Sequence, residues 1–179
     1  MPTVALPLHI PVTTASTTSP GYDLVLLAHV LAAVVGIVAI GVAAGSALAL
    51  RGVLARGAPV PDALARYYRP GVNWAGRVLF LVPVFGVALL AMSGGTWDFA
   101  DTWVSLGTAG WALVAVVAES VLWPEERRLQ EVVAAVTAGD GAASPDLAGE
   151  AARCSRTGAI GLGLVVVLVL VGVLMVAKP

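Results

Sequence analysis

The sequence predicts an all-α, polytopic membrane protein. The fold class is a four-transmembrane-helix bundle with both termini outside the cytoplasm and a short amphipathic helix on the cytoplasmic side. Four apolar runs each reach the length of roughly 20 residues that a helix needs to cross a hydrocarbon layer about 30 Å thick. Hydrophobic residues make up 59% of the chain and charged residues only 12%, whereas a soluble domain carries about 25% charged residues. Every arginine falls in two of the connections between these runs.

The first span runs from about residue 24 to residue 50. It contains no fixed charge, with Asp23 directly before it and Arg51 directly after it. Small residues recur along it, mostly four positions apart, at Ala28, Ala32, Gly36, Gly41 and Gly45. Such spacing lets another helix approach the backbone closely in lipid. We therefore expect the first span to be the most contacted helix of the bundle. Its small-residue face is the predicted contact with a second copy or with a larger membrane complex.

Three further spans follow at about 78–97, 102–123 and 157–177. Pro83 lies in the first half of the second span and predicts a kink, which lipid-embedded helices tolerate when a neighbour satisfies the freed carbonyl. Pro124 directly follows the third span and is expected to stop it. The spans differ in composition, and the fourth consists mostly of valine, leucine and glycine.

The arginines predict how the chain is threaded. They lie in the connections 51–77 and 124–156, while the connection at 98–101 has none. Because cytoplasmic loops carry the excess of Lys and Arg, both long connections are predicted to be cytoplasmic and both termini extracytoplasmic. Residues 1–22, which include His9, are rich in Ser, Thr and Pro and are predicted to form a disordered extracytoplasmic tail. Residues 23–179 then form the transmembrane domain.

The connection 124–156 contains signals for an additional helix. Pro124 and the two glutamates after it are typical of a first helical turn. Leu129, Val132, Val133 and Val136 follow at helical spacing. This pattern predicts a short amphipathic helix that lies along the membrane surface.

His29 is the candidate ligand within the membrane. It lies about five residues, or roughly 8 Å, below the outer end of the first span. Its simplest interpretation is a histidine that packs between helices and forms a local hydrogen bond. Met92 and Met175 are expected at a similar depth on other spans, and one imidazole with two thioethers would suit Cu(I) or, as a His/Met pair, haem. Methionine is equally a common filler of apolar cores, so both interpretations stay open.

Glu119 and Arg77 are predicted to form an ion pair. Glu119 lies one turn before the end of the third span, and Arg77 begins the second span on the same side. An isolated carboxylate near hydrocarbon costs a few kcal/mol, which pairing relieves. We expect a structural Arg77–Glu119 pair with Asn73 or Ser120 beside it. The alternative is that Glu119 carries a proton.

Motifs for catalysis are missing from the sequence. There is no phosphate-binding glycine loop, no HExxH and no GxSxG. Cys154 is the single cysteine and has no metal or redox spacing. The net charge of −1 gives no basic field for nucleic acid. We therefore predict no enzymatic activity, no nucleic-acid partner and no catalytic residue.

Several motifs resemble a family of bacterial, multi-span, predicted integral membrane proteins of unknown function. They are Leu-Leu-Ala-His29-Val-Leu, Arg69-Pro-Gly-Val-Asn73-Trp-Ala-Gly-Arg77, Trp97-Asp-Phe-Ala-Asp-Thr-Trp103-Val and Leu122-Trp-Pro-Glu-Glu-Arg-Arg-Leu129. The resemblance covers roughly residues 22–136 and implies a multi-span topology without an assigned activity. The early histidine motif alone is also similar to copper-resistance membrane proteins of the CopD type.

These observations predict a non-enzymatic accessory or interaction subunit of a membrane complex in the bacterial cell membrane. One alternative is a copper- or haem-handling protein, or an electron-transfer accessory subunit, that uses His29 with Met92 and Met175. A second alternative is a small transporter, although few intramembrane polar groups are available to line a path.

Overall fold

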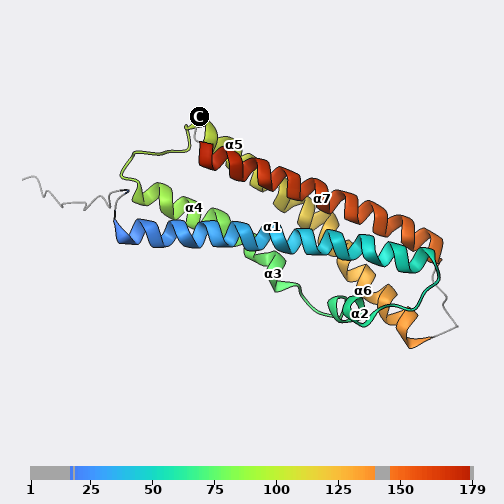
Figure 1. The fold of residues 1–179 in the computed structure, drawn as a ribbon. Helices are drawn as coiled ribbons and strands as arrows, with labels where there is room; N and C mark the ends of the chain where they lie inside the picture. The colour runs from blue at the N-terminus through green and yellow to red at the C-terminus, as the bar shows by residue number, and fades with distance from the viewer. Residues whose placement is uncertain (1–16, 18, 140–145, 178–179) are drawn as a thin grey trace, which may run out of the picture.

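The computed structural model describes residue 17 and residues 19–139 and 146–177, and every regular element within them is a helix (Figure 1). Residues 1–16 and 18 of the predicted tail, including His9, lie outside the described residues, and residues 20–22 form the start of α1. The helices are α1 (Pro20–Ala55), α2 (Asp62–Tyr67), α3 (Trp74–Arg77), the 3-10 helix η1 (Val78–Phe80), α4 (Leu81–Met92), α5 (Thr102–Val117), the π-helix η2 (Ala118–Leu122), α6 (Trp123–Ala138) and α7 (Leu147–Ala177).

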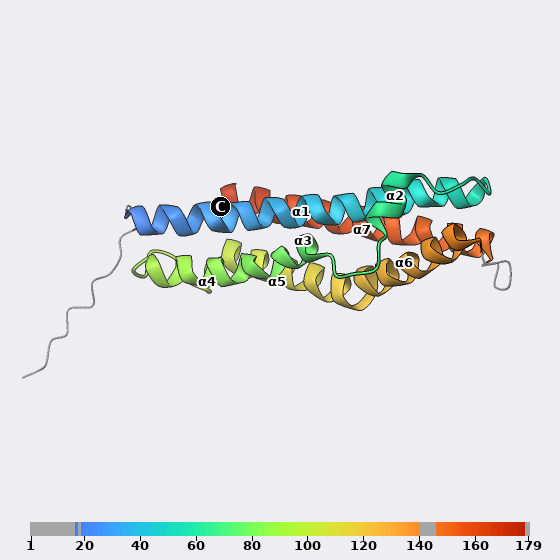
Figure 2. The same cartoon turned by 90° about the horizontal axis from the view of Figure 1, so that it is seen from below.

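Four helical segments are long and apolar enough to cross a membrane: Pro20–Ala55, Trp74–Met92, Thr102–Ala138 and Leu147–Ala177. They lie side by side along one long axis (Figures 1 and 2). All arginines of the sequence lie in the segments 51–77 and 127–156. We call the end where α1 finishes and α7 begins the arginine-bearing end, and the end where α1 begins the arginine-free end.

Helix α1 begins earlier and ends later than the predicted span. Ser19 caps it by accepting a hydrogen bond from the backbone N–H of Tyr22 at 3.2 Å, and Pro20 occupies its first turn, where a missing N–H costs nothing. It continues to Ala55, and Gly57 follows with a left-handed φ of 58°. At 36 residues it is about 54 Å long, which exceeds the hydrocarbon thickness.

Helix α7 packs antiparallel against α1 in the most extensive helix contact of the fold (Figure 1). It starts at Leu147, ten residues before the expected beginning of the fourth span at residue 157. Glycines allow the close approach, because a Cβ at Gly161 would lie only 2.8 Å from the Cβ of Ala44. Of the small residues predicted to form a contact face on α1, Gly36 lies against Leu79 within the chain, whereas a Cβ at Gly45 would meet nothing within 4 Å.

The second span differs from its predicted bounds at both ends. It begins at Trp74 and ends at Met92 instead of running from 78 to 97. Gly94 and Gly95 follow with φ values of 62° and 86°, a left-handed conformation that stops a helix. The Ser93 hydroxyl then donates to the carbonyl oxygen of Leu90 at 2.8 Å and accepts from the backbone N–H of Trp97 at 3.2 Å.

The prediction that Pro124 stops the third span was wrong, because the helix continues from Thr102 to Ala138. The π-helix η2 ends at Leu122, two residues before the proline, and the backbone N–H of its cap residue Trp123 donates to the carbonyl of Ala118 five residues earlier. The proline itself occupies the first turn of α6, where its missing N–H is tolerated.

The predicted amphipathic helix corresponds to α6, but its apolar side is buried inside the fold. Leu129, Val132 and Val133 pack with Leu50 of α1 and Cys154 of α7 in a core cluster at the arginine-bearing end. The expected placement flat on the membrane surface is therefore replaced by packing against α1 and α7. A second core cluster in the middle of the bundle includes Ile40, Leu79, Val114, Leu122, Trp123, Leu164 and Leu168.

Candidate functional site

His29 of α1 contacts α4 at Val82, the residue before Pro83. Its Nδ1 lies 2.9 Å from the carbonyl oxygen of Val82. Because a carbonyl only accepts hydrogen bonds, Nδ1 carries the hydrogen and Nε2 keeps its lone pair. A Cβ at Gly86, one turn further along α4, would lie 3.4 Å from Cε1 of His29. The glycine therefore makes room for the imidazole, and the hydrogen bond fixes its orientation.

Pro83 of α4 creates a second polar contact nearby. Proline has no N–H to donate to the carbonyl oxygen of Leu79, four residues earlier. Trp111 of α5 supplies a donor instead, with its Nε1 at 3.0 Å from that oxygen. A neighbouring helix thus satisfies the carbonyl, as expected for a proline within a membrane-spanning helix. Together, the two contacts join the second span to both α1 and α5.

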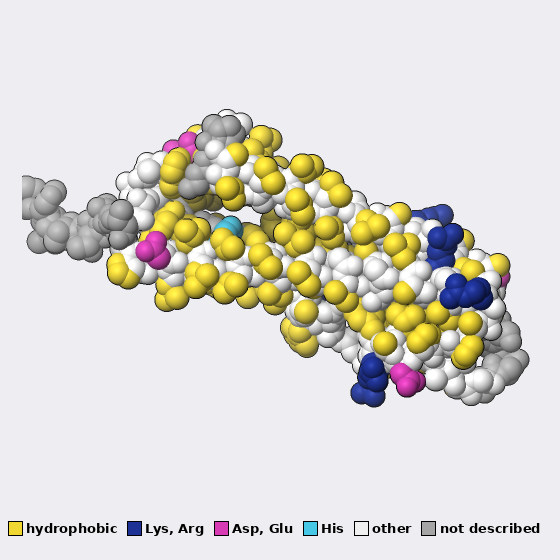
Figure 3. Space-filling view, in the orientation of Figure 1, with side chains coloured by type: hydrophobic (Ala, Val, Ile, Leu, Met, Phe, Trp, Pro, Cys, Tyr) yellow, Lys and Arg dark blue, Asp and Glu magenta, His cyan; other side chains and the backbone are white. Residues whose placement is uncertain are grey.

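A cavity of about 630 Å³ lies between α1, α4, α5 and α7, toward the arginine-free end. His29, Thr108 and three tryptophans, Trp97, Trp103 and Trp111, are among the residues that line it, and the remaining wall is mainly aliphatic. None of the described residues that line it is Asp, Glu, Lys or Arg. Figure 3 shows the hollow between the helices, with histidine atoms at its edge. We call this space the His29 cavity.

Met175 and Met92, the other two predicted ligands, occupy different environments. Met175 of α7 lines the His29 cavity, and its side chain fills the space where a Cβ at Gly107 would lie. Met92 is not among the lining residues and packs instead beside Gly21, whose added Cβ would lie 3.5 Å from the Met92 methyl carbon. The structure therefore brings His29 and Met175 to one cavity and leaves Met92 outside it.

Metal ligands of other types are not gathered in the described part of the chain. Among residues 19–139 and 146–177, no group of three or more His, Cys, Asp and Glu side chains is placed to hold a metal ion. Any metal in the His29 cavity would therefore depend on the imidazole and on the thioether of Met175, which are ligands typical of Cu(I).

Arg77 and Glu119, the predicted ion pair, are in contact. The Arg77 guanidinium donates from Nη1 to Oε1 of Glu119. The guanidinium carbon also lies 3.6 Å from the ring centroid of Trp123, an arrangement in which the positive charge is attracted to the aromatic face. Gly76 allows this approach, because a Cβ there would lie 3.2 Å from the indole nitrogen. Arg77 thus connects the start of the second span to η2 and α6.

Asn73 and Ser120, which were expected beside that ion pair, have other partners. Asn73 caps α3 by accepting from the N–H of Gly76 at 3.4 Å, and its amide donates to Glu126 Oε1 at 3.1 Å. Ser120 donates to the carbonyl of Val116 at 2.6 Å. Asn73 precedes the helix, so its side chain reaches the free backbone N–H of Gly76 and Glu126 of α6.

Tyr67, Asn73 and Glu126 form a polar cluster at the arginine-bearing end. The Tyr67 hydroxyl donates to Glu126 Oε1 at 2.8 Å, and Glu126 is 7% exposed. Burial, followed by the charge of Glu126, raises the pKa of Tyr67 above its usual value of 10.0. The cluster holds the α2–α3 connection against α6, and the amide of Gln130 adds a bond to the carbonyl of Gly71 at 3.2 Å.

Sequence reasoning missed this cluster and the His29 cavity. The asparagine directly before Trp74 is a typical helix N-cap and could have predicted the cap of α3. No sequence signal links Tyr67 to Glu126, because the two positions lie 59 residues apart. The cavity likewise depends on the distances between four helices, and the sequence of any one helix does not determine these distances.

The comparisons with known proteins yield one family. No curated protein and no solved structure matches the chain. The model of the family described as "Predicted integral membrane protein (DUF2269)" matches residues 23–179 and so includes all four long helical segments. The function of this family is unknown. The chain belongs to this family of integral membrane proteins.

Proposed function

We propose that the protein is a non-enzymatic binding protein of a bacterial cell membrane, which holds an apolar small molecule in the His29 cavity. In this proposal it acts as an accessory subunit that presents the molecule to a larger membrane complex. The observation that carries the proposal is the cavity itself, about 630 Å³ in volume and walled by aliphatic and aromatic side chains. Small-molecule sites are typically apolar spaces of this size with a few orienting polar groups.

The polar groups of the cavity suit recognition better than chemistry. His29 has one ring nitrogen committed to Val82, and Nε2 can accept one hydrogen bond from a ligand. Thr108 adds a hydroxyl among the lining residues. A ligand with an apolar chain and one hydroxyl or carboxyl group would match this arrangement. The arginine distribution supports a cytoplasmic arginine-bearing end, which would place the cavity in the outer half of the membrane.

Quenching of tryptophan fluorescence by bromostearic acid tests the proposal. Bromine quenches at short range, and Trp97, Trp103 and Trp111 line the cavity. Trp74 is 75% exposed, so all variants carry Trp74→Phe to remove its signal. We expect saturable quenching in the purified protein, together with an apolar molecule that co-purifies and is identified by mass spectrometry.

A pair of alanine variants on α1 supplies the control. Ala33 lines the cavity, whereas Ala49 is exposed and is not among the lining residues. Ala33→Phe should fill the cavity and reduce the saturable quenching, while Ala49→Phe should leave it unchanged. Equal quenching curves for the two variants would contradict binding in the cavity.

A second candidate function is the handling of Cu(I) or haem. It is favoured by the placement of His29 and Met175 on one cavity. The Val82 carbonyl holds the Nδ1–H of His29, which is how ligating histidines are commonly oriented. Metal analysis and a visible absorption spectrum of the purified protein test this function. Bound copper or a haem spectrum that is lost in both His29→Ala and Met175→Leu supports it, and a colourless, metal-free protein that does not take up Cu(I) removes it.

A further inference from the structure

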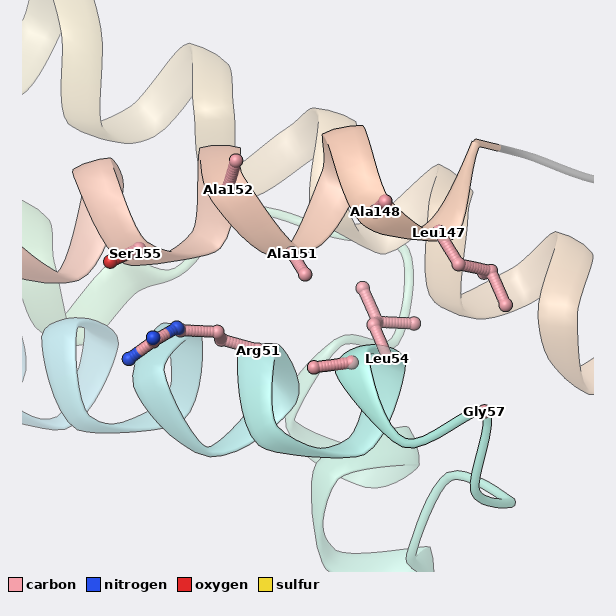
Figure 4. A pocket seen from close by; sticks show the side chains of 9 residues that line it. Arg51, Leu54, Gly57, Leu147, Ala148, Ala151, Ala152 and Ser155 are labelled. Atoms are coloured by element: carbon pink, nitrogen blue, oxygen red, sulfur yellow. The ribbon is translucent and has the colours of Figure 1, made fainter.

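A groove of about 780 Å³ lies between the end of α1 and the beginning of α7, at the arginine-bearing end (Figure 4). Arg51 and Leu54 line it from α1, and Ala148, Ala152 and Ser155 are among its α7 residues. Figure 4 shows the guanidinium of Arg51 extending along the groove toward Ser155. Further along the bundle, the two helices close up where Ala44 meets Gly161. The groove therefore opens where the tight contact between the helices ends.

The groove lies at the depth of the lipid headgroups. Arg51 is the first charged residue after the uncharged run 24–50, and Ser155 directly precedes Arg156, the last charged residue before the uncharged run 157–177. Each uncharged run is long enough to cross the hydrocarbon layer at about 1.5 Å per residue. Both polar side chains of the groove therefore lie where the two helices leave the hydrocarbon.

Arg51 has no acidic partner among the residues that the structure describes. The ion pairs there join Arg77 to Glu119, and Arg128 and Arg153 to Glu150. Glu150, on α7, is turned to Arg128 of α6 at 2.8 Å and is only 7% exposed. The positive charge of Arg51 is consequently available to a ligand within the groove.

We propose that this groove binds the phosphate headgroup of an anionic phospholipid from the adjacent leaflet. A guanidinium donates two parallel hydrogen bonds to phosphate oxygens, and the Ser155 hydroxyl adds a third donor. The methyl side chains of Ala148 and Ala152 leave room for the headgroup, and the acyl chains extend into the hydrocarbon layer beside α1 and α7. Basic pockets between membrane helices recognise anionic headgroups in this manner.

Native mass spectrometry of the full chain with added phosphatidylglycerol or phosphatidylcholine tests the proposal. We expect preferential retention of phosphatidylglycerol. Arg51→Gln should weaken its apparent affinity about fivefold, the factor that one arginine contributes at an anionic surface. Arg66→Gln is the matched control, because Arg66 is exposed on α2 and is not among the groove residues. Thermal melts of both variants confirm that they are folded.

Three results would overturn the proposal. One is equal retention of the two lipids by the unmodified chain. Another is an equal loss of affinity in Arg51→Gln and Arg66→Gln, which would assign the preference to the general positive field. The third comes from a competition experiment that compares sodium phosphate with sodium chloride of the same ionic strength. If sodium phosphate displaces the lipid and sodium chloride does not, the groove is a site for the inorganic anion.

Discussion

The indole N–H of Trp111 donates to the carbonyl oxygen of Leu79 at 3.0 Å, the oxygen to which Pro83 has no N–H to offer. A residue of α5 therefore supplies a donor to the carbonyl of η1 that faces the proline of α4. Because no water is present at membrane depth to replace a lost partner, this bond is expected to contribute more than an exposed one.

Trp111→Phe should lower the free energy of unfolding by about 1 kcal/mol, because it leaves the Leu79 carbonyl without this donor. Unfolding in mixed micelles measures the loss. In a Pro83→Ala background, residue 83 again has a backbone N–H to donate to the Leu79 carbonyl. The loss of unfolding free energy caused by Trp111→Phe should therefore be smaller. Trp74→Phe, at a position that is 75% exposed, should change little. An undiminished cost in the Pro83→Ala background would show that the hydrogen bond is not its cause.

Removal of the Arg77–Glu119 pair should give non-additive losses. Glu119 is about half exposed, so the coupling between the two side chains should be modest, about 0.5–1 kcal/mol. Arg77→Ala should cost more than Glu119→Ala, because it also removes the contact with the ring of Trp123. A double-mutant cycle measured by thermal unfolding in detergent checks both statements. Strictly additive losses would rule out an energetic role for the pair.

The Tyr67 cluster should make stability depend on alkaline pH. The fold raises the pKa of Tyr67, first by burial and then through the charge of Glu126. Above the usual value of 10.0, the unfolded chain releases the phenol proton while the folded chain retains it, so stability falls as pH rises from there. The melting temperature of the unmodified chain should therefore drop between pH 9 and pH 11. Tyr67→Phe should reduce that drop, while Tyr68, whose pKa burial also raises, still contributes to it. The variant should also cost about 1–2 kcal/mol near neutral pH. If the melting temperature of the variant fell with pH as steeply as that of the unmodified chain, Tyr67 would not be the source of the pH dependence.

Two glycines of α7 provide a matched test of helix packing. A Cβ at Gly161 would lie 2.8 Å from the Cβ of Ala44, whereas a Cβ at Gly163 meets nothing within 4 Å. Gly161→Ala should force α1 and α7 apart and destabilise the fold by about 1–3 kcal/mol. Gly163→Ala should be neutral, and unfolding in mixed micelles compares the two. Equal effects would show that helix propensity and not packing decides the outcome.

Much of the fold could be predicted from the sequence, because each apolar run is a local property of the chain. Four runs bounded by charges gave the four membrane-spanning helices, and Asp23 and Arg51 lie inside α1 only a few residues from its ends. The predicted ends of these helices were less accurate, because helix formation outside the hydrocarbon depends on tertiary contacts. Residues 147–156 were assigned to a connection, yet they extend α7 and pack Cys154 against α1 and α6.

The candidate site was less accessible to sequence reasoning. His29 was identified because a histidine within an apolar run is rare, but its partner is a backbone carbonyl that could belong to any residue. Pro83 predicted that some group must satisfy a freed carbonyl, and only the packing of α5 reveals that this group is Trp111. Met92 and Met175 were expected at a similar depth, but only Met175 lines the His29 cavity, because the direction of a side chain around a helix bundle is not encoded by distance along the chain.

The π-helix before Pro124 lies between α5 and α6 within one continuous helical segment. A π turn contains about one residue more than an α turn, and each residue rotates a helix by about 100°. Val114 of α5 packs in the cluster in the middle of the bundle, and Leu129 of α6 packs in the cluster that contains Leu50. Deletion of a single residue within 118–122 would rotate α6 by about 100° relative to α5. The hydrophobic side of α6 would then turn outward, while α5 would keep its packing. The rotational setting of α6 relative to α5 thus depends on the number of residues in this one turn.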